Sequence, residues 1–326
     1  MEKQGVNSSE GMRVLKRAAA VAAVIIALFL VLNILAGGRF FTASNMLSVL
    51  SNSVVTAFIV LGMCFIFTMG ITDLSIGSIM ILASNAGGVL ALWVGMGYFG
   101  LIVGALAVGI ALTMLNVFLM RKAEIPPWIL GLGMTMVYEA IGAIYNTTMI
   151  QQGRQAVSLG DVCRDLGAPP WNVILLVIGV AVAYFVYNRT SIGIGLRAVG
   201  SNSAVAKLMG VNVNKATFLA VLVGGCFIGM GAAINQSYAG RIVPATGLNS
   251  IASVFNPLAA FLLAKALSNV FNITIGAAVG AFTITAIFNV LTILGVPSGT
   301  WQQVMLGACV LMCGILSQRK FKGVVK

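Results

Sequence analysis

The residues that could do chemistry in this chain are few, because 60% of its 326 residues are hydrophobic and only 8% are charged. There is no histidine, which excludes mechanisms that need an imidazole base or an imidazole metal ligand. The five cysteines are scattered, so the sequence predicts neither a metal site nor a disulfide framework. The remaining candidates are carboxylates and amides in or beside apolar runs, and basic residues between those runs.

Asp73 and Ser75 lie in the segment MGITDLSIGS, residues 69–78, which separates two apolar runs. Gly70 can end the preceding helix, Asp73 can cap the following one, and Ser75 can satisfy free backbone amides. Irregular backbone at membrane depth is tolerated only where protein or a water-filled cavity satisfies it. The segment is therefore either a tight capped turn or part of a solute pathway.

Glu139 falls in the middle of an apolar run that begins at Pro126 and Pro127. A charged group at that depth costs roughly 2.5 to 3.5 kcal/mol. We therefore expect Glu139 to face the interior of a helical bundle or to be protonated. No Lys or Arg lies at comparable depth, and proton coupling through this carboxylate is a further possibility.

Amides within the apolar runs form another set of candidates. An amide inside a bundle either joins helices or hydrogen-bonds a polar solute, and joining is the commoner role. Asn33 and Asn116 belong to this class but are not among the candidates for the lining of a pathway. With Asp73, Ser75 and Glu139, the candidates for the lining of a pathway are Asn52, Asn85, Asn256, Asn289 and, as an aromatic stacking face, Tyr138.

The stretch NRTSIGIGLRAVGSNSAVAKLMGVNVNK, residues 188–215, contains four basic residues and no acidic residue. After a glycine-containing turn, its apolar spacing predicts a short amphipathic helix with an N-cap among residues 201–203 and an end at Gly210. Such a helix either lies at the membrane interface or inserts into a groove on a cytoplasmic partner. Gly195 and Gly200 have the glycine spacing of a Walker A motif, but Lys and Ser/Thr do not follow. If nucleotide hydrolysis drives this protein, another subunit must therefore perform it, since the chain also has no soluble domain large enough for a nucleotide fold.

Long apolar runs must position these residues. They predict an all-α fold, a polytopic membrane bundle of about ten transmembrane helices that forms one integral membrane domain over residues 1–326. Two GxxxG spacings, at Gly225/Gly229 and Gly276/Gly280, allow close helix packing. The predicted spans run approximately over 18–36, 46–70, 77–93, 98–120, 126–150, 171–188, 216–234, 251–268, 272–294 and 301–317.

The basic residues distinguish the two sides of this bundle. Of 19 Lys and Arg, four lie on one side of the ten spans, and the other fifteen lie on the side of the N-terminus. The four are Arg39, Arg154, Arg164 and Arg241. The positive-inside rule then predicts that both termini are cytoplasmic. The net charge of +12 is thus mostly a topology signal and not a signature of nucleic-acid binding.

These motifs resemble the permease subunit of bacterial ABC importers of the ribose-type monosaccharide class. GITDLSIGS is similar to that family's GGIDLSVGS-like turn, IPPWILGLGM at 125–134 to its IPPFIVTLGM-like start of span five, and GVPSGTWQQVMLG to its last periplasmic turn. LRAVGSNSAVAKLMGVNV resembles its cytoplasmic coupling segment. The matching positions there are Arg197, Ala198, Gly200, Asn202, Ala206 and Gly210.

Spans eight and nine depart from the family pattern. The stretch TGLNSIASVFNPLAAFLLAKALSNVF lacks the usual acidic residue, and Ala264 and Lys265 stand where two glycines are expected. Pro257 is expected to break the span. The solute, and whether this permease pairs with a second copy of itself or with a different permease, stay open.

The resemblance implies a transport subunit of the bacterial cytoplasmic (inner) membrane that is not itself an enzyme and holds no cofactor. A separate ABC ATPase subunit would bind ATP and dock on the coupling loop 189–215. A periplasmic or lipid-anchored binding protein would deliver a small solute, most simply a monosaccharide, to a pair of permeases. The outer residues Arg39, Arg154, Arg164 and Arg241 would form its docking face.

Other functions remain open at this point. The scarcity of charges in the predicted pathway fits a neutral polar solute, so a nucleoside is an alternative cargo. A secondary transporter or a channel is the alternative from another class, and it would need coupling charges and inverted repeats. A receptor or scaffold fits less well because the loops are short.

Overall fold

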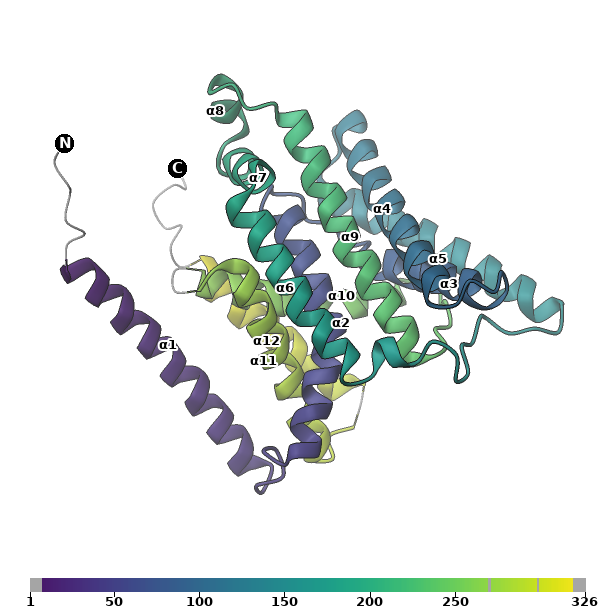
Figure 1. The fold of residues 1–326 in the computed structure, drawn as a ribbon, viewed down its shortest axis with the longest axis horizontal. Coiled ribbons are helices and arrows are strands. Elements are labelled where there is room, and N and C mark those ends of the chain that lie inside the picture. Colours follow the sequence, from purple (N-terminus) through teal and green to yellow (C-terminus); the bar gives the residue numbers. More distant parts are fainter. Residues whose placement is uncertain (1–7, 269–270, 298, 319–326) are drawn as a thin grey trace.

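The computed structural model describes residues 8–268, 271–297 and 299–318 (Figure 1). Over these residues the chain is helical, with turns, two short 3-10 helices and an isolated β-bridge between Ser158 and Arg241. The long helices are α1 (Ser8–Leu35), α2 (Ala43–Phe67), α3 (Ile76–Leu92), α4 (Gly97–Ala123), α5 (Pro127–Gln151), α6 (Trp171–Arg189), α9 (Val213–Ala239), α10 (Ala252–Leu267), α11 (Ile273–Ile293) and α12 (Thr300–Gln318). The short elements are α7 (Ser191–Ser201), α8 (Ser203–Leu208), η1 (Asp165–Gly167) and η2 (Asn249–Ile251).

Each predicted apolar run contains one long helix. Seven helical segments are long and apolar enough to cross a membrane, namely α2, α4, α5, α6, α9, α11 and the combined η2–α10. The apolar parts of α1, α3 and α12 are shorter, at 22–35, 76–92 and 301–315. The predicted membrane helical bundle is therefore confirmed. The prediction about the termini falls on 1–7 and 319–326, which lie outside the described residues.

Helices α2 and α9 form the centre of the bundle, where most of their length is buried by their neighbours (Figure 1). The GxxxG glycines explain how closely those neighbours approach. A Cβ at Gly229 would lie 2.7 Å from the Ala105 carbonyl oxygen of α4, and one at Gly280 would lie 2.5 Å from the Ala260 carbonyl oxygen of α10. Both distances are shorter than any normal contact, so the predicted role of these glycines in close packing is confirmed.

Helix α10 runs without interruption through Pro257, so the expected break in this span is wrong. Pro257 is the sixth residue of α10 and is buried. The missing N–H costs a single i→i−4 backbone bond, to the Ser253 carbonyl oxygen in the first turn, which the rest of the helix tolerates. The helix therefore continues to Leu267.

The glycine-rich stretch before the predicted amphipathic helix is itself helical, which corrects the expected turn. Helix α7 contains Gly193, Gly195 and Gly200. A Cβ at Gly193 would lie 1.9 Å from the Tyr187 carbonyl oxygen of α6. These glycines therefore serve close contacts of a helix and do not mark a loop. Helices α7 and α8 lie at one end of the bundle, opposite the α1–α2 turn (Figure 1).

Candidate functional site

Helix α8 forms as the sequence predicts, because both of its ends carry local signals. The Asn202 side chain accepts the N–H groups of Ala204 and Val205 at 3.0 and 3.1 Å, which caps the helix. Gly210 has a φ of 84°, a left-handed conformation that ends the helix. Between them, Ala206 is buried in a small cluster with Val199 and Ala216. The cap, the short helix and its end are therefore confirmed.

Gly200 brings α7 directly onto the end of α2. A Cβ at this position would lie 2.0 Å from the Thr68 carbonyl oxygen and 3.3 Å from the Met69 Cα. Met69 and Ala198 also pack against the cluster around Ala206. The predicted coupling segment is thus in contact with the α2–α3 turn that carries Asp73.

Arg197 lies along α7 rather than pointing to a partner. Its guanidinium carbon lies 5.4 Å from the centroid of the Tyr187 ring, and its Nε donates to the Gly193 carbonyl oxygen at 3.1 Å. The Tyr187 hydroxyl in turn lies 3.3 Å from the Thr68 hydroxyl. Arg197 therefore helps to fix α7 against α6 and the end of α2.

The surface that α8 offers to a partner is apolar. Leu208 is 88% exposed, Met209 79% and Val205 51%. An exposed cluster of large apolar side chains on a short helix is typical of a contact surface. The six motif residues position this helix, and these three neighbouring residues face outward.

Asp73 lies at the centre of a buried polar cluster, which we define as Asp73, Ser75, Asn116 and Tyr138. The Asn116 amide donates to Asp73 Oδ2 at 2.8 Å and to the Ser75 hydroxyl at 2.6 Å. The Asn116 carbonyl oxygen accepts the Tyr138 hydroxyl at 2.7 Å. Asp73 Oδ1 also accepts the Ser75 N–H at 2.8 Å, so the tight turn is present, but Ser75 and not Asp73 is the N-cap of α3, and no side chain caps this helix. The Ser75 hydroxyl, however, accepts a side-chain amide and does not satisfy a backbone amide.

Glu139 is buried, and its hydrogen-bond partners lie in the turn before α10. Oε1 accepts the Ser250 N–H at 2.7 Å and the Ser250 hydroxyl at 2.6 Å, while Oε2 accepts the Leu248 N–H at 2.8 Å. Glu139 therefore faces the interior of the bundle, which was one of the two expectations from the sequence. These donors, and not a basic residue, compensate its burial. The arrangement explains how a carboxylate is kept at this depth without a Lys or Arg partner.

A comparison with known protein families places this arrangement in context. The family described as "Branched-chain amino acid transport system / permease component" matches residues 45–314, which is most of the chain. The chain belongs to this family. With the apolar helices, membership identifies a multi-pass protein of the inner membrane.

Several individual permeases are similar to the chain over most of its length. The ribose import permease protein RbsC of Escherichia coli (strain K12) is 26% identical over 293 residues, covering 86% of this chain and 88% of the relative. The xylose transport system permease protein XylH of the same strain is 23% identical over 351 residues, covering 89% and 88%. The fructose import permease protein FrcC of Rhizobium meliloti is 26% identical over 206 residues, covering 60% and 57%. The predicted resemblance to ribose-type permeases is confirmed. No solved structure is significantly similar to the chain.

Within this permease bundle, the four candidate amides share no hydrogen-bond partner among the described residues. Asn289 of α11 forms a reciprocal pair with Asn45 of α2, with both contacts at 3.0 Å, so this amide joins two helices. Asn52 accepts the Tyr238 hydroxyl. Asn85 donates to the Ile81 carbonyl oxygen at 2.9 Å. The Oδ1 atoms of Asn85 and Asn256 are buried without a hydrogen-bond partner among the described residues.

The four arginines expected on the outer side differ in their surroundings. Arg164 donates to the Tyr238 carbonyl oxygen at 2.7 Å, and Arg241 donates to the Gln155 side chain at 2.5 Å. Both hold the 151–170 connection against the end of α9. Arg39 donates to the Ala36 carbonyl oxygen at 3.3 Å, in the α1–α2 turn. Arg154 is exposed. The structure therefore places two of the four in contacts between the 151–170 connection and the end of α9.

The 151–170 connection is packed onto the bundle. The Gly167 N–H donates to the Ser237 hydroxyl at 2.9 Å, and Leu159 and Cys163 are buried. Burial raises the pKa of the Cys163 thiol. Over the residues that the structure covers, there is no group of three or more His, Cys, Asp or Glu that could hold a metal ion.

Sequence reasoning passed over Asn116, although this amide organises the polar cluster. It looks like any other amide in an apolar run, and its partner Asp73 lies 43 residues earlier in the chain. Ser250 was also missed as the partner of Glu139. Two of the three donors to Glu139 are backbone N–H groups, which any residue type can supply. No residue-type pattern in the sequence points to either contact.

Proposed function

We propose that this chain is the membrane-spanning permease subunit of an ATP-driven importer that carries a monosaccharide. Family membership and the import permeases to which the chain is similar support this proposal. The observation that carries it is the exposed apolar surface of α8, held at one end of the bundle by its capped, glycine-packed connection to α7. A separate ATPase subunit binds there, hydrolyses ATP and leaves this subunit without a cofactor of its own.

The proposed topology has ten membrane crossings with both termini in the cytoplasm. The seven long apolar segments and the shorter apolar parts of α1, α3 and α12 support this count. Arg121 and Lys122 at the end of α4, and Lys207 and Lys215 near the start of α9, lie at the end of the bundle that carries α7 and α8. The positive-inside rule places that end in the cytoplasm. A second permease, either another copy or a different one, completes the pathway.

The proposed cargo is a neutral sugar delivered by a solute-binding protein on the outer side. The names of the similar permeases favour a sugar over the nucleoside alternative. Asn85 and Asn256 are the candidate amides with a free buried acceptor, and each would accept a solute hydroxyl. The polar cluster around Asp73 satisfies its own members, which supports a role in holding helices more than in binding solute. The exposed Arg39 and Arg154 are the outer arginines best placed to meet a binding protein.

The docking surface is tested by replacing Leu208 and Met209 together with Asp. Both side chains are largely exposed, so we expect the variant to fold and to lose the ATPase, because charged groups would be buried at the contact. The measurement is copurification of the ATPase with the tagged permease from cells that make the whole transporter. The matched control replaces the exposed Val162 and Val243 of the outer connections with Asp, and it should keep the ATPase.

Transport by the assembled proteins tests the rest of the proposal. Uptake of a labelled monosaccharide into proteoliposomes should need the ATPase, ATP and the binding protein, and should fail with the L208D/M209D variant. ATP-independent uptake by the permease alone would contradict the proposal and favour a secondary transporter or channel.

A further inference from the structure

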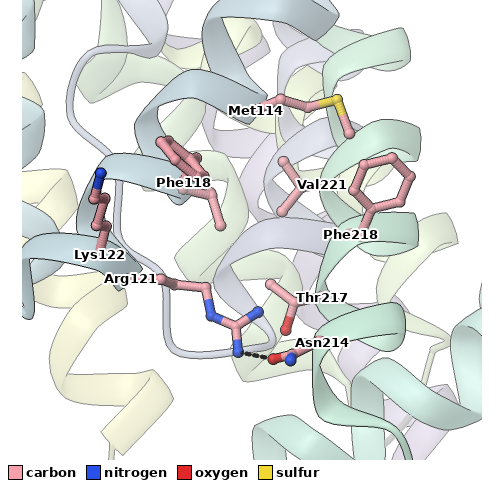
Figure 2. Close-up of a pocket in the computed structure, with 9 residues that line it drawn as sticks. Met114, Phe118, Arg121, Lys122, Asn214, Thr217, Phe218 and Val221 are labelled. Atoms are coloured by element: carbon pink, nitrogen blue, oxygen red, sulfur yellow. Dashed lines mark hydrogen bonds between the residues drawn. The ribbon is translucent and has the colours of Figure 1, made fainter.

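A groove runs between α4 and α9 on the side of the bundle (Figure 2). Its volume is about 500 Å³, and its floor is formed by the buried side chains of Val117, Thr217 and Val221. Phe118 and Phe218 stand on its two sides and are 59% and 57% exposed. The Thr217 hydroxyl is turned to the Val213 carbonyl oxygen at 2.8 Å, so the floor presents little polarity. Such a surface fits an apolar chain.

One end of this groove is cationic. Arg121 and Lys122, in the last turn of α4, line it, and the Lys122 ammonium lies 5.9 Å from the centre of the Phe118 ring. Arg121 donates to the Asn214 side chain across the groove (Figure 2). The groove is therefore apolar along its length and positively charged where α4 ends.

A second cavity adjoins this cationic end. Its volume is about 540 Å³, and it shares Arg121 and Asn214 with the groove. It adds Lys207 of α8 and the polar residues around Asn212. Among the residues that the structure describes, no acidic side chain lines either cavity. The groove and the second cavity together, which we call the double cavity, thus connect an apolar groove to a basic, polar chamber (the second cavity) beside the coupling segment.

We propose that this double cavity binds one anionic glycerophospholipid from the cytoplasmic leaflet. An acyl chain lies in the groove between Phe118 and Phe218, and the phosphate binds at Arg121 and Lys122, with Lys207 at the far side of the chamber. Basic residues at the membrane surface attract anionic headgroups, and amphipathic cationic side chains suit this boundary. The orientation in the leaflet rests on the proposed topology.

Charge argues for a lipid and against a second copy of the chain in this groove. A two-fold contact is self-complementary, so each copy would present the same patch to the other. Arg121 and Lys122 of both copies would then meet near the contact, and like charges brought together oppose binding. A lipid phosphate instead supplies the missing negative charge.

Native mass spectrometry of the purified full-length chain in detergent tests the proposal. The probes are phosphatidylglycerol and phosphatidylcholine with identical acyl chains. We expect one phosphatidylglycerol to be retained in preference to phosphatidylcholine. The R121Q/K122Q variant should lower its retention by about tenfold or more, since two surface charges are lost.

Two matched variants control for charge and fold. R39Q/R189Q removes the same number of positive charges away from the groove and should retain the lipid. R121K/K122R keeps the charge and should retain it as well. Equal retention of both lipids, or unchanged retention in R121Q/K122Q, would overturn the proposal. So would a loss of dimers in R121Q/K122Q with lipid retention intact, because it would assign the groove to a second copy.

The outcome is independent of the proposed function. The lipid is measured on the permease alone, without ATPase, binding protein or sugar. A failure to retain phosphatidylglycerol would leave the ATPase copurification result standing, and a failure of copurification would leave the lipid result standing.

Discussion

Asp73 and Glu139 are two buried carboxylates that the bundle accommodates in different ways. Asp73 accepts a side-chain amide, from Asn116, and one backbone N–H. Glu139 accepts two backbone N–H groups and one hydroxyl, all from residues 248–250. The two sites are neighbours on α5, because Tyr138 reaches the first and Glu139 itself forms the second.

The comparison teaches that the source of the donors decides how replaceable a buried carboxylate is. Where the donor is a side chain, the donor and the carboxylate can exchange positions, so either residue of the pair can carry the negative charge. Backbone N–H donors cannot be exchanged by substitution, so the acceptor must remain at the position that faces them. Glu139 should therefore be the less replaceable of the two.

Replacing Glu139 with Ala should have the largest effect. It leaves the Leu248 N–H and the Ser250 N–H and hydroxyl without their acceptor, and each of the two buried donors, both on Ser250, costs about 1 to 3 kcal/mol. We expect a loss of at least about 3 kcal/mol, measured as a lower midpoint of thermal unfolding in detergent. A thiol-reactive dye can report unfolding because Cys64 and Cys309 are buried. The exposed Glu124→Ala should leave the midpoint nearly unchanged, and an equal loss there would remove the contrast.

Asp73→Asn should have an intermediate effect that a second change reverses. The new amide would face the Asn116 amide, so Asn116 must turn over, with the Tyr138 hydroxyl accepting instead of donating, and the bond to a charged carboxylate is replaced by a weaker neutral one. We expect a loss of about 2 kcal/mol, recovered largely in the double variant D73N/N116D, which moves the carboxylate across the pair. A double-mutant cycle on unfolding midpoints measures this recovery. Purely additive effects would show that the pair is not exchangeable.

Tyr138→Phe should have the smallest effect. It removes one hydroxyl and leaves the Asn116 carbonyl oxygen unpaired, at a cost of about 1 kcal/mol. The same unfolding assay checks this, with the exposed Tyr184→Phe as control. In the D73N background the change should cost about as much as alone, because a turned-over Asn116 would lose an acceptor for its amide instead of a donor to its carbonyl oxygen. A larger loss of stability in that background would contradict the hydrogen-bond arrangement described for the polar cluster.

The sequence was sufficient for features that depend on local or periodic signals. The long apolar runs predict the helices, and Asn202 and Gly210 predict the ends of α8, because a cap acts on residues two or three positions away. The stretch around Gly193 was misread as a turn, since glycine in a helix is useful only when another backbone lies close. That neighbour is known only from the fold.

Features that depend on distant partners were not predictable. Asp73 and Glu139 were recognised as unusual, but the choice of Asn116 and of the 248–250 turn follows from how α3, α4, α5 and α10 pack. The exposure of Leu208 and Met209 likewise depends on which side of α8 Ala206 buries. The sequence therefore identified the right segments and only part of their geometry.

The close approach at Gly200 has a mechanical consequence. With the Thr68 carbonyl oxygen pressed against the bare Cα of Gly200, α7 and the end of α2 share a contact without slack. A displacement of α8 by a bound subunit cannot be absorbed there by a flexible side chain. We expect a movement of α7 towards α2 to displace Thr68, and with it the short segment that leads to Asp73. The glycine thereby works as a rigid joint between the surface of the protein and its buried hydrogen bonds.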